Sequence, residues 1–163
     1  MNLFEFHIQS QKLKSHNRAF FTKLKLKTPK NLDLLFHRSH EQVFETTDCT
    51  TCANCCKTTS PIFYQTDIER AAKALQIKPG AFITQYLFMD EEGDFVLKEA
   101  PCAFLGGDNR CKIYDSRPKA CREYPHTDRK KMQQILDLTY RNTLVCPAVL
   151  AIVQKVEAEL KIS

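Results

Sequence analysis

The chain of 163 residues contains no tryptophan, only four glycines and no long apolar run. None of its segments approaches the roughly 18 consecutive apolar residues that a membrane-spanning helix needs, so we expect no membrane partner. The opening residues MNLFEFHIQSQK lack the basic start, apolar stretch and cleavage site of a secretory leader, so we expect a cytoplasmic protein. Glycine-rich phosphate loops, nucleophile elbows and paired carboxylates are also missing, so no motif indicates an enzyme class.

The net charge of +5 is concentrated near the start of the chain. Residues 1–40 carry 8 basic and 2 acidic residues, a balance of +6, whereas the remainder has 16 basic and 17 acidic residues, or −1. A basic segment of this kind can contact nucleic acid or another acidic partner. A solvated helix face is the more common role, and we favour it over nucleic-acid binding.

Apolar residues recur with helical spacing near both ends of the chain. The first stripe consists of Phe6, Leu13, Phe20 and Leu24, and the last consists of Val149, Ile152, Val153, Val156 and Leu160. Between them we expect a helix begun by a capping box of Thr66 with Glu69, a strand at 95–97 and a hairpin around Gly106-Gly107. The predicted fold class is α+β, mostly α-helical, with a small β-hairpin element and a cysteine-rich metal-binding centre. We expect one compact domain overall, with a basic amphipathic helical segment at 1–44 and a cysteine-cluster metal-binding domain at 45–163.

Eight cysteines are the most informative residues of the chain. They are Cys49, Cys52, Cys55, Cys56, Cys102, Cys111, Cys121 and Cys146. A reduced protein that groups its thiols closely usually holds a metal with them, so all eight are candidate ligands. One or two could instead be inert core residues, and Cys146, before an apolar helix, is the first candidate for that role.

The spacing of these thiols suits two kinds of metal centre. Zinc favours a closed tetrahedron of four thiolates, and eight cysteines equal two such sites. Cys49, Cys52 and Cys55 are spaced like the ferredoxin run that wraps a [4Fe–4S] cube, and Cys146-Pro147 supplies a distant cysteine followed by proline. The predicted cofactor is therefore an iron–sulfur cluster, with [4Fe–4S] slightly favoured, or Zn²⁺. The adjacent side chains of Cys55 and Cys56 are expected to diverge and to serve different roles.

The downstream cysteines have recognisable surroundings. Cys102 and Cys111 flank the glycine turn, as in a knuckle whose backbone amides point at the sulfurs, while Cys121 follows on a short helix. Arg117 and Arg122 lie on either side of Cys121 and are candidates to offset the negative charge of a thiolate centre.

These residues together resemble the YkgJ-type cysteine-cluster (CxxCxxCC) family of zinc- or iron-chelating domains. The resemblance is carried by Cys49 to Cys56, by Pro101 to Leu105 and by Cys111 to Pro125, and it covers about residues 45–150. It implies metal or cluster binding. It also draws attention to Asp67, which falls where such proteins often place an acid near the cluster, although a helix cap explains that position equally well.

Three functions are compatible with this pattern. The first is a cytosolic metal-binding protein acting in metal handling, redox chemistry or as an accessory module with an unidentified protein partner. The second is an iron–sulfur-dependent enzyme that modifies proteins by methyl transfer or redox chemistry, with Tyr64, Asp67, Tyr114 and His126 as candidates by proximity. The third is a structural zinc module that presents the basic segment to nucleic acid or protein. His37 and His40 are expected to be surface or capping residues rather than metal ligands.

Overall fold

The structure is a computed structural model that describes residues 2–160, and its chain folds into two compact units. The first unit consists of Met1–Cys49 and Pro125–Ser163, and the second of Thr50–Tyr124. The fold class is confirmed as α+β and mostly helical, with a small three-stranded antiparallel sheet. Whether residues 1–44 act as a segment of their own stays a prediction.

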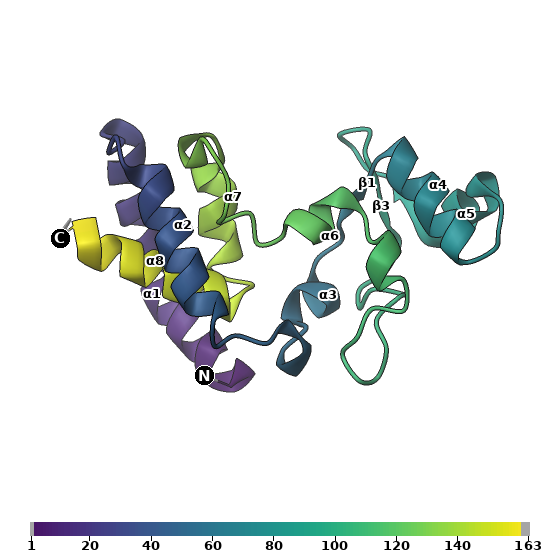
Figure 1. The fold of residues 1–163 in the computed structure, drawn as a ribbon, viewed down its shortest axis with the longest axis horizontal. Coiled ribbons are helices and arrows are strands. Elements are labelled where there is room, and N and C mark those ends of the chain that lie inside the picture. The colour runs from purple at the N-terminus through teal and green to yellow at the C-terminus, as the bar shows by residue number, and fades with distance from the viewer. Residues whose placement is uncertain (1, 161–163) are drawn as a thin grey trace. The chain divides into compact units, whose positions relative to one another are not determined.

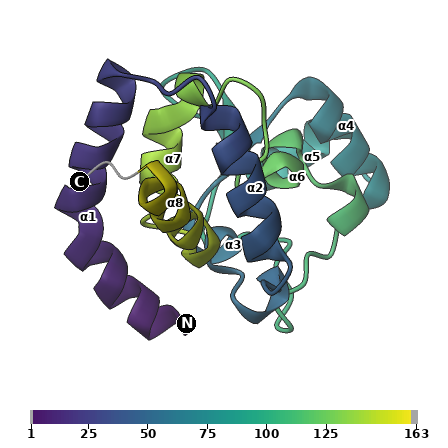
Figure 2. The ribbon, with the colours of Figure 1, turned by 60° about the vertical axis from the view of Figure 1, so that its left-hand side comes forward.

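The first unit is built from helices of both chain ends (Figures 1 and 2). Its elements are α1 (Leu3–Leu26), α2 (Leu32–Phe44), the 3₁₀ turn η3 (Met132–Ile135), α7 (Leu136–Asn142) and α8 (Pro147–Leu160). Asn2 begins α1 by accepting the Glu5 amide, while the Glu5 carboxylate accepts the Asn2 amide, which is a capping box. Among residues 2–160, no helix is both long and apolar enough to span a membrane.

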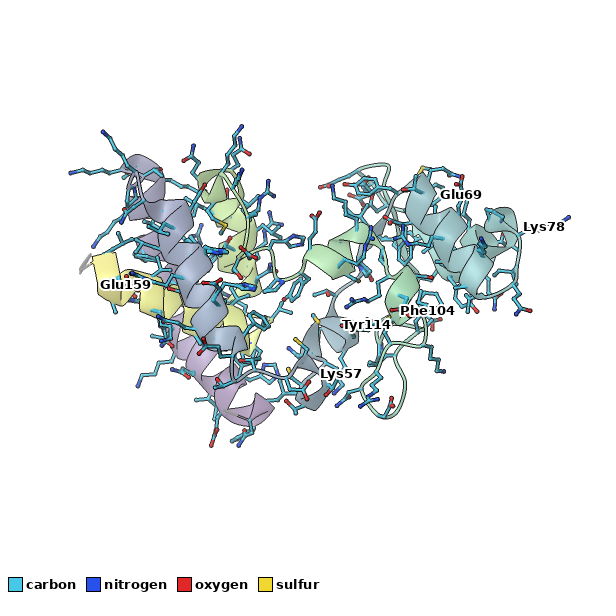
Figure 3. All side chains as sticks on the ribbon, viewed as in Figure 1. Lys57, Glu69, Lys78, Phe104, Tyr114 and Glu159 are labelled. Atoms are coloured by element: carbon cyan, nitrogen blue, oxygen red, sulfur yellow. The ribbon has the colours of Figure 1, made fainter. Side chains whose placement is uncertain are left out.

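The predicted apolar stripes form the core of this unit. Phe6, Phe20 and Leu24 are buried on α1, whereas Leu13 is only half-buried. On α8 the buried members are Val149, Ile152, Val153 and Val156, and Leu160 lies at the edge of the core. The charged residues of the same helices remain at the surface, where Arg38 pairs with Glu159 near the end of α8 (Figure 3).

The second unit surrounds a small sheet. Its elements after the turn η1 (Cys49–Thr51) are α3 (Asn54–Thr58), β1 (Ile62–Phe63), α4 (Gln65–Ala74), α5 (Pro79–Tyr86), β2 (Leu87–Met89), β3 (Phe95–Leu97), η2 (Tyr114–Ser116) and α6 (Lys119–Glu123). The strand order is β1-β3-β2, with Ile62 opposite Val96 and Leu87 opposite Leu97. Phe82 is fully buried at the centre of the apolar cluster, where its ring stacks on Phe104 at 5.8 Å.

Two local predictions in this unit need correction. The capping box of Thr66 with Glu69 is wrong, because α4 already begins at Gln65 and its cap is made by the Asp67 carboxylate, which accepts the Tyr64 amide at 3.2 Å. The hairpin around Gly106-Gly107 is present only as a single antiparallel bridge between Leu105 and Cys111. The segments on either side of the glycines, which carry Cys102 and Cys111, have irregular backbone. Their amide groups are therefore not all used in strand pairing.

Candidate metal centre

Six of the eight cysteines belong to the second unit, where they come from three segments. Cys52, Cys55 and Cys56 lie on or just before α3, Cys102 and Cys111 flank the glycine loop, and Cys121 lies on α6. Cys49 begins η1 at the boundary between the units, and Cys146 packs at the edge of the apolar core of the first unit. All eight cysteines are present as thiols.

The cysteine run turns sharply before α3. Ala53 adopts a left-handed backbone conformation with φ of 49°, which residues other than glycine rarely adopt. The Lys57 ammonium donates to the Cys52 carbonyl at 3.0 Å and holds the turn. The sulfurs of Cys55 and Cys56 lie 4.0 Å apart, so the expected divergence of these neighbours is not observed.

Backbone amides of the glycine loop influence the pKa of its two cysteines. Burial raises the pKa of Cys102, and the amides of Phe104 and Leu105 partly oppose this rise. Burial also raises the pKa of Cys111, and the Ile113 amide partly opposes it. Amides in such positions favour the thiolate over the thiol, as they do around thiolate metal sites. A knuckle around a bound metal stays a prediction.

The glycine loop is fastened to the cysteine run at two points. The Cys102 amide donates to the Cys56 carbonyl at 2.8 Å, and the Asn109 side-chain amide donates to the Thr50 carbonyl at 3.0 Å. Gly106 closes the loop through its amide, which donates to the Arg110 carbonyl at 2.7 Å. The backbone therefore holds segments together that are about fifty residues apart in the sequence.

Four thiols influence one another's pKa values through their charges, namely those of Cys56, Cys102, Cys111 and Cys121. Burial, together with charge on Cys56, Cys102 and Cys111, raises the pKa of the Cys121 thiol to about 12. Burial likewise raises the pKa of Cys102 and of Cys111, with Cys56 adding to each effect. The pKa of Cys56 instead falls to about 6, chiefly because the Cys55 thiol donates a hydrogen bond to it, with Arg117 and Lys57 contributing.

Arg117 is the principal cation of this group. Its guanidinium lies over the Tyr114 ring, 3.5 Å from the centroid, and its Nε donates to the Tyr114 carbonyl at 2.8 Å. Its charge lowers the pKa of Cys56, Cys111 and Cys121. Tyr114 therefore serves as the platform that orients Arg117 (Tyr114 and Lys57 are labelled in Figure 3). Arg122 is exposed, and the cationic influence on these thiols comes from Arg117 and Lys57.

Asp67 joins α4 to the segment that carries Cys121. Its carboxylate is 1% exposed, accepts the Lys119 amide at 3.1 Å and pairs with Arg70 at 2.6 Å. The same Arg70 nitrogen donates to the Arg117 carbonyl at 2.6 Å. Asp67 is thus both a helix cap and a support for the thiol-bearing segment. Arg70 was not predicted, although its position three residues after Asp67 on a helix is the signal that could have indicated the pair.

The other residues singled out in the sequence have separate roles. His37 bonds with Asp128, and His40 Nδ1 lies 2.8 Å from the Thr127 hydroxyl, so both histidines join α2 to a following segment within the first unit. His126 also belongs to the first unit, where it adopts a left-handed backbone conformation. Tyr64 is an exposed residue at the cap of α4.

The donor set fits a thiophilic metal, although the sulfurs are not yet closed around one point. Across residues 2–160, no three cysteine, histidine or acidic side chains converge in a metal-holding arrangement. The amide donors, the Arg117 charge and the mutual influence of four thiols are nevertheless the environment that a thiolate-bound zinc or iron centre uses.

The fold and this site define a small, mostly helical protein with a thiol-rich centre. Residues 48–143 match the CxxCxxCC family, described as "Putative zinc- or iron-chelating domain", and this match spans more than half of the chain. The chain belongs to this family. No curated protein and no solved structure matches it.

Substitution of Gly106 tests the glycine loop. A Cβ at Gly106 would lie 2.7 Å from Asp108 Oδ1 and 3.1 Å from the Arg110 carbonyl oxygen, whereas a Cβ at Gly107 would meet nothing within 4 Å. We expect Gly106→Ala to lower the free energy of unfolding by about 1–3 kcal/mol and Gly107→Ala to change it by less than about 0.5 kcal/mol. Urea denaturation of the two variants measures the difference. Equal stabilities would show that Gly106 is not sterically required.

Substitution of Asp67 tests the support of Cys121. Asp67→Asn removes the charge that holds Arg70, and the lost charged hydrogen bonds should cost about 1.5–3 kcal/mol. We expect Cys121 to be alkylated by iodoacetamide several-fold faster in this variant, as followed by peptide mass spectrometry. The control is Glu69→Gln, an exposed acid whose carboxylate accepts the Gln65 side chain. An unchanged rate at Cys121 in both variants would contradict the supporting role.

Proposed function

We propose that the second unit holds a thiolate metal centre whose principal ligands are Cys56, Cys102, Cys111 and Cys121. The observation that carries this proposal is that these four thiols influence one another's ionisation: burial and mutual charge raise the pKa of three of them, and backbone amides and Arg117 only partly oppose that rise. Clustered thiolates repel one another, and a bound cation removes that cost. Membership in a family described as zinc- or iron-chelating supports the same conclusion.

Cys52 and Cys55, with Cys49, remain candidate ligands of the same or a second centre. The spacing of this triplet favours an iron–sulfur cluster, and a [4Fe–4S] cube in particular. Such a cluster would supply one-electron transfer, whereas zinc would supply structural cross-linking. We assign Cys146 the lowest rank as a ligand because it packs against the helical core of the first unit.

The role that follows is metal handling, electron transfer or service as an accessory module for a protein partner. The eight reduced thiols suit a reducing compartment such as the cytoplasm. Two alternatives are an iron–sulfur-dependent modifying enzyme and a zinc module that presents the basic segment. No specific contact favours either of them.

Metal content tests the proposal directly. Protein purified without oxygen should contain zinc, or iron with acid-labile sulfide and a broad absorption band near about 400 nm. We expect Cys121→Ser to lose most of this metal and Cys146→Ser to retain it, as measured by elemental analysis. Metal-free wild-type protein from cells supplied with both metals would overturn the proposal. Equal loss in the two variants would instead place Cys146 among the ligands.

The pH dependence of metal uptake provides a second test. The thiols of Cys102, Cys111 and Cys121 have raised pKa values and are protonated at neutral pH, so binding as thiolates must release their protons. We expect the apparent zinc affinity of the reduced apo-protein to rise by at least about tenfold per pH unit between pH 6 and 8. Competition with a chromophoric chelator measures this slope. An affinity independent of pH would contradict thiolate ligation by these residues.

A further inference from the structure

A cleft in the first unit lies apart from every cysteine that we propose as a principal ligand. It has a volume of about 450 Å³ and is formed between α1 and α7. Its polar lining consists of Arg18, Thr22 and Lys25 from α1 and of Asp137, Tyr140 and Arg141 from α7. The α1 residues are spaced by four and three positions and the α7 charges by four, so each set occupies one helix face. A volume of this size accommodates a small ligand.

The cleft carries uncompensated positive charge. Lys25 is paired with Asp137, and this pair is close to neutral. The guanidinium groups of Arg18 and Arg141 have no ion pair or hydrogen bond with any side chain or carbonyl in the part of the chain that the structure describes. Two arginines without a carboxylate partner line one cleft, and an anion bound in that cleft would be attracted to both.

Aromatic side chains lie at the base of the cleft. Phe21 is buried beneath the cleft, and its ring meets that of the half-buried Tyr140 edge to face, with centroids 5.9 Å apart. The Thr22 hydroxyl donates to the Arg18 carbonyl at 2.9 Å, which fixes its position on the helix. The two rings form the floor of the cleft, and the charged groups line its open sides.

We propose that this cleft binds the phosphoryl group of a small ligand through Arg18 and Arg141. Guanidinium groups offer paired N–H donors that match phosphate oxygens bidentately. The excess of two positive charges matches a phosphate dianion better than a single carboxylate. The basic start of the chain thereby includes a specific site, in addition to a solvated surface.

Calorimetric titration of the whole 163-residue chain, purified without oxygen and with any bound metal retained, tests this site. Inorganic phosphate and AMP are the probes, and adenosine is the phosphate-free control, all at constant ionic strength near 0.15 M. We expect saturable binding of phosphate and AMP and none of adenosine. Tighter binding of AMP than of phosphate would identify a nucleotide-like ligand, and equal affinities would identify the phosphoryl group alone, each within the proposal.

Paired variants separate this cleft from general charge effects. The double variant Arg18→Gln with Arg141→Gln should weaken phosphate binding by at least about tenfold. The double variant Lys12→Gln with Lys78→Gln removes the same charge from exposed positions outside the cleft and should change the affinity by less than about twofold. Both altered arginines are exposed, so we expect the fold to be retained. Equal affinities of the wild type and the arginine variant, or no saturable binding up to about 10 mM phosphate, would overturn the proposal.

Discussion

The buried carboxylate of Asp67 is the interaction on which the thiol-rich centre depends. A charged group that is 1% exposed is tolerated only when its oxygens are fully engaged, and here they accept the amides of Tyr64 and Lys119 and the guanidinium of Arg70. Arg70 in turn fixes the carbonyl of Arg117. Asp67 thus holds the start of α4 and the start of α6, and its partner Arg70 holds the backbone of Arg117.

The frame assembled in this way places thiols where their ionisation is unfavourable. Three of the four principal thiols have raised pKa values, because each is partly buried and each feels charge on its neighbours. The backbone bond from Cys102 to the Cys56 carbonyl keeps two of the segments together despite this repulsion. Such an arrangement is costly for an apo-protein with several ionised thiols and favourable for one that binds a metal, since the cation compensates all of the thiolates at once.

Much of this could be predicted from sequence because the governing interactions are local. The helical stripes followed from apolar spacing, and the strand at 95–97 from its β-forming residues. The start of α4 was misplaced because Thr66–Glu69 and Tyr64–Asp67 are overlapping capping patterns, and the helix uses the second, whose Asp67 also accepts the Lys119 amide. The Arg70 contact with Arg117 and the cleft between α1 and α7 each join segments distant in sequence, which no local pattern specifies.

Of the two arginines beside Cys121, Arg117 affects the charge balance of the thiols, whereas Arg122 is exposed. Four thiolates around Zn²⁺, or around an oxidised four-iron cube, leave a net charge of about −2. The cations whose charge reaches these thiols are Arg117 and, at Cys56, Lys57, which together provide two positive charges. Arg117 is fixed by the Tyr114 ring and carbonyl, whereas Lys57 is fixed by the Cys52 carbonyl. The charges of Arg117 and Lys57 would therefore balance the proposed four-thiolate centre, and both cations are held by backbone carbonyls, which leave their charge uncancelled.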